Sequence, residues 1–213
     1  MSDKFNIASN SLSVFPLSKN RTGDRSARLF YENNVANIIR QLIDVEGFLI
    51  SDSFSLDVGN ALSDSGIVTY PILLKDTLVF NLYGYYFCIN KGAQICRVSF
   101  DQNNIDSVTY TLYAAIEIDT VANEIKYFDN NSVYEGLQIL MLGTDETVEK
   151  PSETADYHFI ELCTFTMSYN KVNADNEPER WEWVVNTDIC DASYQKISVK
   201  SLDMSISRID GKH

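Results

Sequence analysis

Apolar and polar residues alternate with a period of two along most of the chain after residue 46. The clearest case is 108–118, where every second residue from Val108 to Ile118 is apolar, and 157–169 alternates in the same way. Successive side chains of a β-strand point to opposite faces, so this pattern predicts half-buried strands. Shorter stretches with strand character are 47–51, 67–74, 94–100, 125–128, 136–142, 181–185 and 197–206. Polar turn sequences separate them, which predicts a mainly β fold, an antiparallel β-sandwich or barrel-like domain, over 47–213.

The stretch LVFNLYGYYFCI, residues 78–89, is apolar on both faces and carries five aromatic rings. It is either part of a core or an exposed platform of rings that binds a ligand. A platform would alternate its rings with polar residues on one exposed face, so we expect a core. Gly84 supplies the positive φ that a primed turn needs, so Tyr83-Gly84 is predicted to be the tip of a hairpin that pairs 78–82 with 85–89. The alternative is one long strand with a β-bulge at Gly84.

The first 46 residues carry a different pattern. Residues 1–30 are polar and Ser-rich, with Pro16 and Gly23 as breakers, which predicts an extended N-terminal arm that orders on a neighbouring subunit or frays in a monomer. Residues 31–46 place apolar residues at spacings of three and four, so we expect one N-terminal amphipathic helix. Its apolar stripe consists of Val35, Ile38, Ile39, Leu42 and Ile43. We expect the stripe to pack on a sheet, with a helix contact between subunits as the alternative.

Residues 144–155, TDETVEKPSETA, interrupt the strand pattern with an acidic segment that contains Pro151. The strand pattern resumes directly afterwards, so we expect a long surface loop within one domain rather than a linker between two lobes. The chain is thus divided into an arm (1–30), a helix (31–46) and a β domain (47–213).

Acidic residues dominate the charge of this 213-residue chain, in which 30 acidic and 17 basic side chains give a formal charge of −13. No stretch concentrates Lys and Arg enough to cover a phosphate backbone, so nucleic acid and anionic membranes are not expected partners. No run approaches the roughly 18 apolar residues that cross a bilayer, and the first residues lack the apolar region of a signal peptide. We therefore expect production in a cytosol.

No motif in the sequence identifies a reaction. The cysteines Cys88, Cys96, Cys163 and Cys190 are far apart and only two histidines occur, so we expect free, packed thiols rather than structural zinc. Nucleophile, phosphate-binding and dinucleotide motifs do not occur. The sequence thus predicts a protein that is not an enzyme and that uses no catalytic residue, metal or cofactor.

Two further features are candidate sites. Glu161 lies on an otherwise apolar strand face, and we interpret it as a residue paired with Lys or Arg, with a hydrolytic carboxylate as the alternative. Trp181 and Trp183 are two residues apart and share one face of a strand. If buried, they anchor a core or an interface; if exposed, they form a surface on which sugars stack. We favour the core or interface.

Several stretches occur in a characteristic order: a polar arm, ENNVANIIRQLIDVEGFLIS, LVFNLYGYYFCI, TLYAAIEIDTVANEI and finally SRIDGKH. In this order they resemble structural proteins of tailed bacteriophages, particularly tail, baseplate or head-fibre components of gut phages, including crAss-like ones. The resemblance implies a non-enzymatic virion protein that is produced in the host cytoplasm. It also implies a homo-oligomer, with a trimer as one option, that is attached to other virion proteins.

Such an assembly works by burying surface between subunits. The interface candidates are Phe15, Val35, Ile38, Ile39, Leu42, Trp181 and Trp183. An alternative function from another class is a carbohydrate- or receptor-binding module of a phage or bacterium. That function requires the Trp pair and the rings of residues 83–86 to be exposed on one surface.

Overall fold

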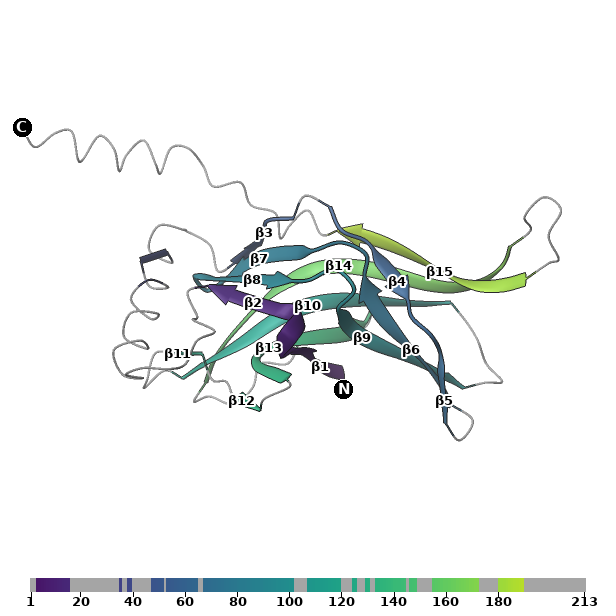
Figure 1. Cartoon of the computed structure of the whole chain (residues 1–213), viewed down its shortest axis with the longest axis horizontal. Coiled ribbons are helices and arrows are strands. Elements are labelled where there is room, and N and C mark those ends of the chain that lie inside the picture. Colours follow the sequence, from purple (N-terminus) through teal and green to yellow (C-terminus); the bar gives the residue numbers. More distant parts are fainter. Residues whose placement is uncertain are drawn as a thin grey trace, which may run out of the picture.

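Antiparallel β-strands make up most of the described chain in the computed structural model (Figure 1). The structure describes residues 3–15, 35, 38, 39, 47–51, 53–64, 67–101, 107–119, 124, 125, 129, 130, 133–144, 146–148, 155–172 and 180–189. The strands are β1 (Asp3–Ala8), β2 (Leu12–Phe15), β3 (Gly47–Leu49), β4 (Leu56–Val58), β5 (Leu62–Asp64), β6 (Ile67–Leu74), β7 (Leu78–Leu82), β8 (Tyr85–Ile89), β9 (Gln94–Asp101), β10 (Val108–Asp119), β11 (Glu124–Ile125), β12 (Asp129–Asn130), β13 (Val133–Gly143), β14 (Ala155–Val172) and β15 (Arg180–Ile189). One 3-10 turn, η1 (Ser9–Ser11), lies between β1 and β2.

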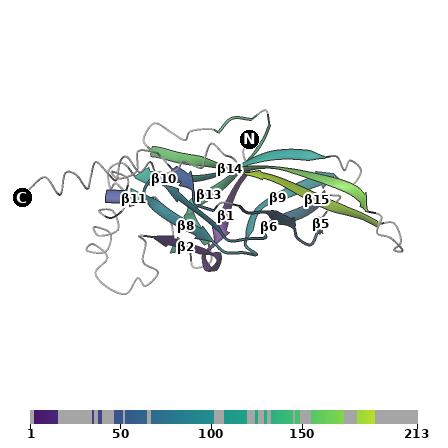
Figure 2. The ribbon, with the colours of Figure 1, turned by 90° about the horizontal axis from the view of Figure 1, so that it is seen from above.

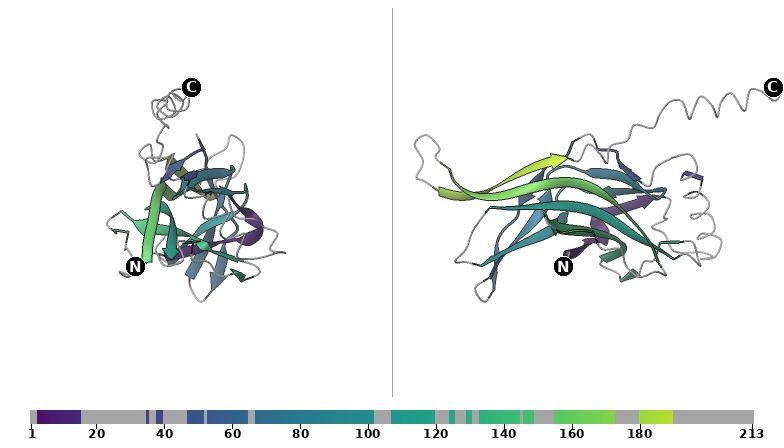
Figure 3. Two further views of the ribbon diagram at one scale, coloured as in Figure 1. Left: turned by 90° about the vertical axis from the view of Figure 1, so that its left-hand side faces the viewer. Right: turned by 180° about the vertical axis from the view of Figure 1, so that it is seen from behind.

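The described strands form three sheets. Sheet A has the order β1-β13-β10-β14-β15, with β11 paired to β10 and β12 paired to β13. Sheet B has the order β2-β8-β7-β3, and sheet C is built on β6, which pairs with β4 and β5 along one edge and with β9 along the other. The long strands of sheet A curl into half of a barrel (Figure 3). At one end of the molecule β14 and β15 reach beyond the other strands (Figures 1 and 2).

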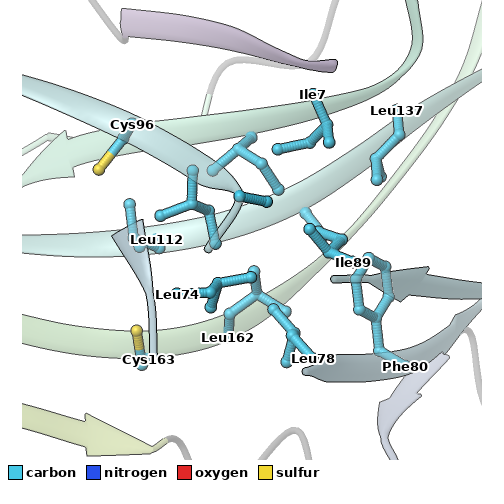
Figure 4. Packing of buried hydrophobic residues seen from close by; sticks show 14 of the residues in the cluster. Ile7, Leu74, Leu78, Phe80, Ile89, Cys96, Leu112, Leu137, Leu162 and Cys163 are labelled. Carbon is cyan, nitrogen blue, oxygen red and sulfur yellow. The ribbon is translucent and has the colours of Figure 1, made fainter. Parts of the chain in front are cut away.

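One hydrophobic core joins the three sheets. Leu112 and Leu162 of sheet A, Phe80 and Ile89 of sheet B and Leu74 of sheet C meet in the interior, each no more than 1% exposed (Figure 4). Burying a side chain of this size contributes about 1.5–3 kcal/mol, so the contact between sheets is the main source of stability.

The edges of sheet A lie beside edges of sheet C, with β1 against β9 and β15 against β4. At the first of these contacts the guanidinium carbon of Arg97 in β9 lies 5.6 Å from the centroid of the Phe5 ring in β1. A cation over an aromatic ring at such a site contributes about 0.5–1 kcal/mol. This contact therefore links the two sheets where their backbones are not hydrogen-bonded to each other.

The stretch 78–89 forms the predicted hairpin. Its strands β7 and β8 pair Leu78 with Ile89 and Leu82 with Tyr85, which leaves Tyr83 and Gly84 as a two-residue tip. Both tip residues have positive φ, 52° at Tyr83 and 83° at Gly84, as a primed turn requires. The predictions of a hairpin and of a core position are both confirmed, and the alternative of a single bulged strand is excluded.

Gly59 and Pro71 explain why β4 and β5 are separate strands although both pair with β6. The Pro71 carbonyl accepts a hydrogen bond from the Gly59 N–H at 2.8 Å. The N–H and C=O of a strand residue point to the same side, so the missing N–H of Pro71 falls opposite the break between β4 and β5. A Cβ at position 59 would lie 2.8 Å from Pro71 Cγ, so only glycine fits against the ring.

The alternation in β14 departs from the predicted strict period of two. A register shift at Leu112/Tyr113 of β10 places a β-bulge in β14 near Leu162. Ile160 and Leu162 face the core before the bulge, and Cys163 and Phe165 face it afterwards. In a strand with strict alternation, residues 160 and 163 would lie on opposite faces. An extra residue in one strand reverses the faces from that point on, which a pattern read along one strand does not show.

Most predicted strands are present, including those at 47–51, 67–74, 94–100, 136–142 and 181–185 as β3, β6, β9, β13 and β15. Of 125–128 only residue 125 is described, in β11, and 197–206 lies outside the described residues. The sequence analysis missed β1, β2, β4, β5 and β12. Residues 144–155 connect β13 to β14, which are strands of the same sheet.

The prediction that residues 1–30 form an extended arm, which docks on a neighbouring subunit or frays in a monomer, is wrong for residues 3–15. These residues form β1 and β2, which pair with β13 and β8 of the same chain. Ile7 is fully buried, Leu12 is 3% exposed, and Phe5 and Val14 pack against the core, so apolar side chains hold this segment in the body. Residues 16–30 lie outside the described residues.

The described part of the chain shows no N-terminal α-helix as a bounded element. Of the predicted helix, only residues 35, 38 and 39 are described, and each is in helical conformation.

We expect Gly59→Val to lower the free energy of unfolding by about 1–3 kcal/mol, because the new side chain collides with the Pro71 ring and forces β4 away from β6. Urea unfolding followed by circular dichroism measures the change. Ala61→Val is the matched control, since Ala61 lies in the same break and is exposed. Equal stability of the two variants would contradict the packing described for Gly59.

Candidate functional site

The outer face of sheet B, which points away from the core, carries a row of large side chains across all four strands. Register places Phe15 of β2 beside Tyr86 of β8, Tyr86 beside Asn81 of β7, and Asn81 beside Phe48 of β3. Phe15 at one edge is 54% exposed, Tyr86 is half-buried and Phe48 is 7% exposed. The inner face of the hairpin lies in the core shared with sheets A and C. Its outer face is also buried around Asn81 and Phe48, and it is exposed at the edge, at Phe15.

Asn81 is the polar residue in this row. It is 1% exposed, and neither its Oδ1 nor its Nδ2 has a hydrogen-bond partner among the described residues. A buried amide without partners costs about 1–3 kcal/mol. Within the described residues, the outer face of sheet B is therefore apolar with one buried amide that has no partner.

The structure places the predicted interface residues at separate points rather than in one cluster. Phe15 ends β2 and Ile38 is 57% exposed, while Val35 and Ile39 are half-buried. Leu42 lies outside the described residues. Trp181 and Trp183 belong to β15, where their backbones pair with Lys171 and Tyr169, and their side chains lie outside the description.

A histidine that the sequence analysis did not select lies where the hairpin tip meets sheet A. The rings of Tyr83 and His158 stack with centroids 3.7 Å apart and an interplanar angle of 23°. His158 Nε2 lies 3.0 Å from Asp156 Oδ2, a distance typical of an ion pair when the imidazole is protonated, although the atoms are not aligned for a hydrogen bond. The contact joins β14 to a turn whose Tyr has an unfavourable backbone conformation.

A second apolar cluster lies on the outer face of sheet A. Its buried members are Ala115, Leu140, Leu142 and Tyr157, and Tyr113, Val148 and Phe159 pack against them. Burial raises the pKa of Tyr157 to about 12, and the Glu117 carboxylate, which is opposite Tyr157 in the β10–β14 ladder, adds to the increase. The Tyr157 hydroxyl has no hydrogen-bond partner among the described residues and remains protonated at neutral pH.

The described cysteine thiols and Glu161 lie in surroundings that do not favour a catalytic role. Cys88, Cys96 and Cys163 are free, as predicted, whereas Cys190 lies outside the described residues. Burial, with a smaller contribution from Cys163, raises the pKa of the Cys96 thiol well above its ordinary value, which suppresses the nucleophilic thiolate. Glu161 is half-buried on the outer face of sheet A, and its neighbour in the β10 register is Tyr113 rather than a second acid.

Within the ranges that the structure describes, no group of three or more His, Cys, Asp and Glu side chains is placed to hold a metal ion. None of the helical residues described belongs to a helix long and apolar enough to cross a membrane. No family model matches the chain, and no curated protein or solved structure matches it.

We expect a double-mutant cycle of Tyr83→Ala and His158→Ala to give a coupling energy of about 0.5–1.5 kcal/mol, because each single variant already removes the stack between the two rings. Urea unfolding of the four proteins measures it. The comparison cycle uses Tyr83→Ala with Tyr70→Ala, since Tyr70 contacts Phe100 in sheet C and the two effects should add. Additive effects in the first cycle would show that the stack contributes nothing.

We expect one tyrosine to ionise near pH 12 rather than near its ordinary pKa of 10.0, and this step to disappear in Tyr157→Phe. The folded state keeps this proton longer than the unfolded state, so the associated stability is present below about pH 10 and is lost as the pH rises towards 12. Ultraviolet difference titration measures the ionisation, and urea unfolding between pH 9 and 12 measures the stability. A Tyr157→Phe variant with the same stability profile as the parent would contradict the assignment.

Proposed function

We propose that this protein is a non-enzymatic structural protein of a virion, a tail, baseplate or head-fibre component that acts by assembling with copies of itself and with other virion proteins. The observation that carries the proposal is the outer face of sheet B. At the β2 edge this face presents Phe15, which is 54% exposed, beside the half-buried Tyr86, on strands whose other face already lies in the core. A large exposed apolar side chain beside a second aromatic ring at a sheet edge favours contact with another protein surface.

The charge of the chain favours a contact of this kind. Copies with a net charge of −13 repel one another, so they associate only where apolar burial outweighs repulsion. The row from Phe15 to Phe48 contains no charged residue. Phe15 and Ile50, at 54% and 36% exposed, lie towards the two edges of this uncharged face.

The proposal also includes the arrangement of the three sheets. Sheets B and C and the curled sheet A enclose one core, and edges of sheets A and C lie side by side, which supports a barrel-like sandwich. We also propose that residues 31–46 form an amphipathic helix whose exposed Ile38 takes part in the contact between subunits. The order of sequence elements that resembles phage structural proteins supports a virion location after production in the host cytoplasm.

The alternative of a carbohydrate- or receptor-binding module has less support. It requires the rings of residues 83–86 to form one exposed surface. Tyr85 is 3% exposed in the core, and Tyr83 is stacked on His158. The rings of this stretch therefore do not supply a stacking platform for a sugar.

We expect the purified chain to have a solution mass that is a multiple of its 24.2 kDa, and Phe15→Asp to reduce that mass, because a charge at this position opposes burial of the sheet B face. Light scattering coupled to size exclusion measures the mass. Asn90→Asp is the control, since Asn90 is exposed and follows β8 without contributing an apolar side chain.

A second measurement tests the virion location. Mass spectrometry of purified particles of the phage that encodes the chain should detect it at a fixed ratio to the other structural proteins. A chain that stays a 24.2 kDa monomer at high concentration and does not occur in the particles would overturn the proposed function.

A further inference from the structure

The outer face of sheet B is covered on its β3 side and uncovered on its β2 side. Phe48 of β3 and Asn81 of β7 are 7% and 1% exposed, whereas Phe15 of β2 is 54% exposed. Phe48 belongs to neither of the two apolar clusters that the described residues form, so it does not pack into the core between the sheets. The structure contains one chain, so Phe48 and Asn81 are buried beneath another part of that chain.

The stretch 16–46 starts and ends beside these buried side chains. β2 ends at Phe15 and β3 begins at Gly47, and the register places both at the end of sheet B that carries the hairpin tip. β2 and β3 are the edge strands, three strand spacings or about 14 Å apart. A Cβ at Gly47 would lie 2.7 Å from the Asn81 carbonyl oxygen, so the chain enters β3 in close contact with β7. This stretch therefore meets sheet B at the buried side chains themselves.

Three residues of this stretch are described, and they show how it is oriented. Residues 35, 38 and 39 are in helical conformation. Val35 and Ile39 are half-buried, whereas Ile38 is 57% exposed. Residues four apart lie on the same face of a helix, so the face with Val35 and Ile39 is turned towards the protein and Ile38 lies on its solvent side. In Figures 1 and 3 the short coloured segment at residues 38 and 39 lies just beyond the hairpin-tip end of sheet B.

We propose that residues 31–46 form a helix that crosses the hairpin-tip end of sheet B and buries Phe48 and Asn81 beneath its Val35–Ile39 face. A helix of this length is about 24 Å long, which is enough to span the distance between the edge strands. The helix leads directly into β3 at Gly47, which brings its last turns to the β3 side of the sheet. The covered side chains, Phe48 and Asn81, lie on that side.

The proposed packing also defines which part of sheet B is left for another protein. The helix covers the β3 side, while Phe15 and the half-buried Tyr86 stay uncovered at the β2 edge, and Ile38 lies on the outer side of the helix. The inference goes beyond the proposed function, because the contact lies within one chain. It holds for a monomer as well as for an oligomer, so its test does not depend on the solution mass.

The first test identifies the segment that lies over Phe48. The photo-crosslinking residue p-benzoylphenylalanine replaces Phe48 in the full-length chain, and mass spectrometry of the tryptic peptides locates the link after irradiation. We expect a link between peptides 29–40 and 41–75 in protein that migrates as a single chain. The matched control carries the same residue in place of Ile67, which lies in the same peptide, is 53% exposed and belongs to sheet C. The control should give no link to peptide 29–40.

The second test measures the contact by a double-mutant cycle of Ile39→Ala and Phe48→Ala in urea unfolding. We expect the unfolding constant of the double variant to differ at least about threefold from the product of the two single effects, because each variant already removes the shared contact. The comparison cycle combines Phe48→Ala with Ile38→Ala, the exposed neighbour on the same helix. Its two effects should multiply without a remainder.

Each outcome supports or overturns the proposed packing. A link from position 48 to residues 190–213, to any other part of the chain outside 29–40, or to a second copy in a band of twice the mass would overturn it. The same coupling in both cycles, or none in either, would also overturn it. Thermal unfolding checks that the crosslinking variant is folded. If the larger side chain unfolds it, the two cycles decide alone, because alanine is smaller than the side chains it replaces.

Discussion

The packing of the β7–β8 hairpin against sheet A is the interaction on which the rest of the structure depends. Phe80 and Phe87 are fully buried and stacked, with ring centroids 5.3 Å apart. Among the described strands, β2 and β3 at the edges of sheet B pair with no strand outside this hairpin. The N-terminal residues also rely on it, because β1 pairs in sheet A and β2 pairs in sheet B, with η1 as the corner between them. Removing the hairpin from the core would therefore remove sheet B and release β2, while β1 would keep its pairing with β13.

Two local irregularities are tolerated because tertiary contacts offset them. Tyr83 adopts a positive φ that is unfavourable for a bulky residue, and the stack on His158 from another sheet compensates for it. Pro71 removes a donor from the middle of β6, and Gly59 fits against its ring where the facing strand breaks. The second irregularity also leaves β5 as a short strand of its own that contains the exposed Leu62 and pairs with no described strand other than β6.

The distribution of apolar surface connects this architecture to the proposed assembly role. Apolar side chains lie outside the core on sheet B, around Phe15, and on sheet C, around Leu62 and Ile67. On the outer face of sheet A the apolar residues are already packed together under aromatic rings, as Tyr113 and Phe159 show with centroids 6.0 Å apart. Further along the same face, Thr109 and Thr111 are hydrogen-bonded to threonines of β14. Among the described strands, the large exposed apolar side chains therefore lie on sheets B and C rather than on sheet A.

The sequence by itself determined the elements whose signal is local. Alternation over 108–118 predicted β10, and the apolar stretch 78–89 with its central Gly84 predicted a hairpin in the core, because period and turn preference depend only on neighbouring residues. The tertiary structure decided what depends on distant partners. The polar segment 3–15 forms strands because β13 and β8 supply its hydrogen bonds, and the bulge in β14 moves Cys163 to the core face because β10 sets the register. Phe15 and Leu62 are exposed because their strands, β2 and β5, lie at sheet edges among the described strands. Which strands pair depends on residues far apart in the sequence, so the pattern within one strand does not predict it.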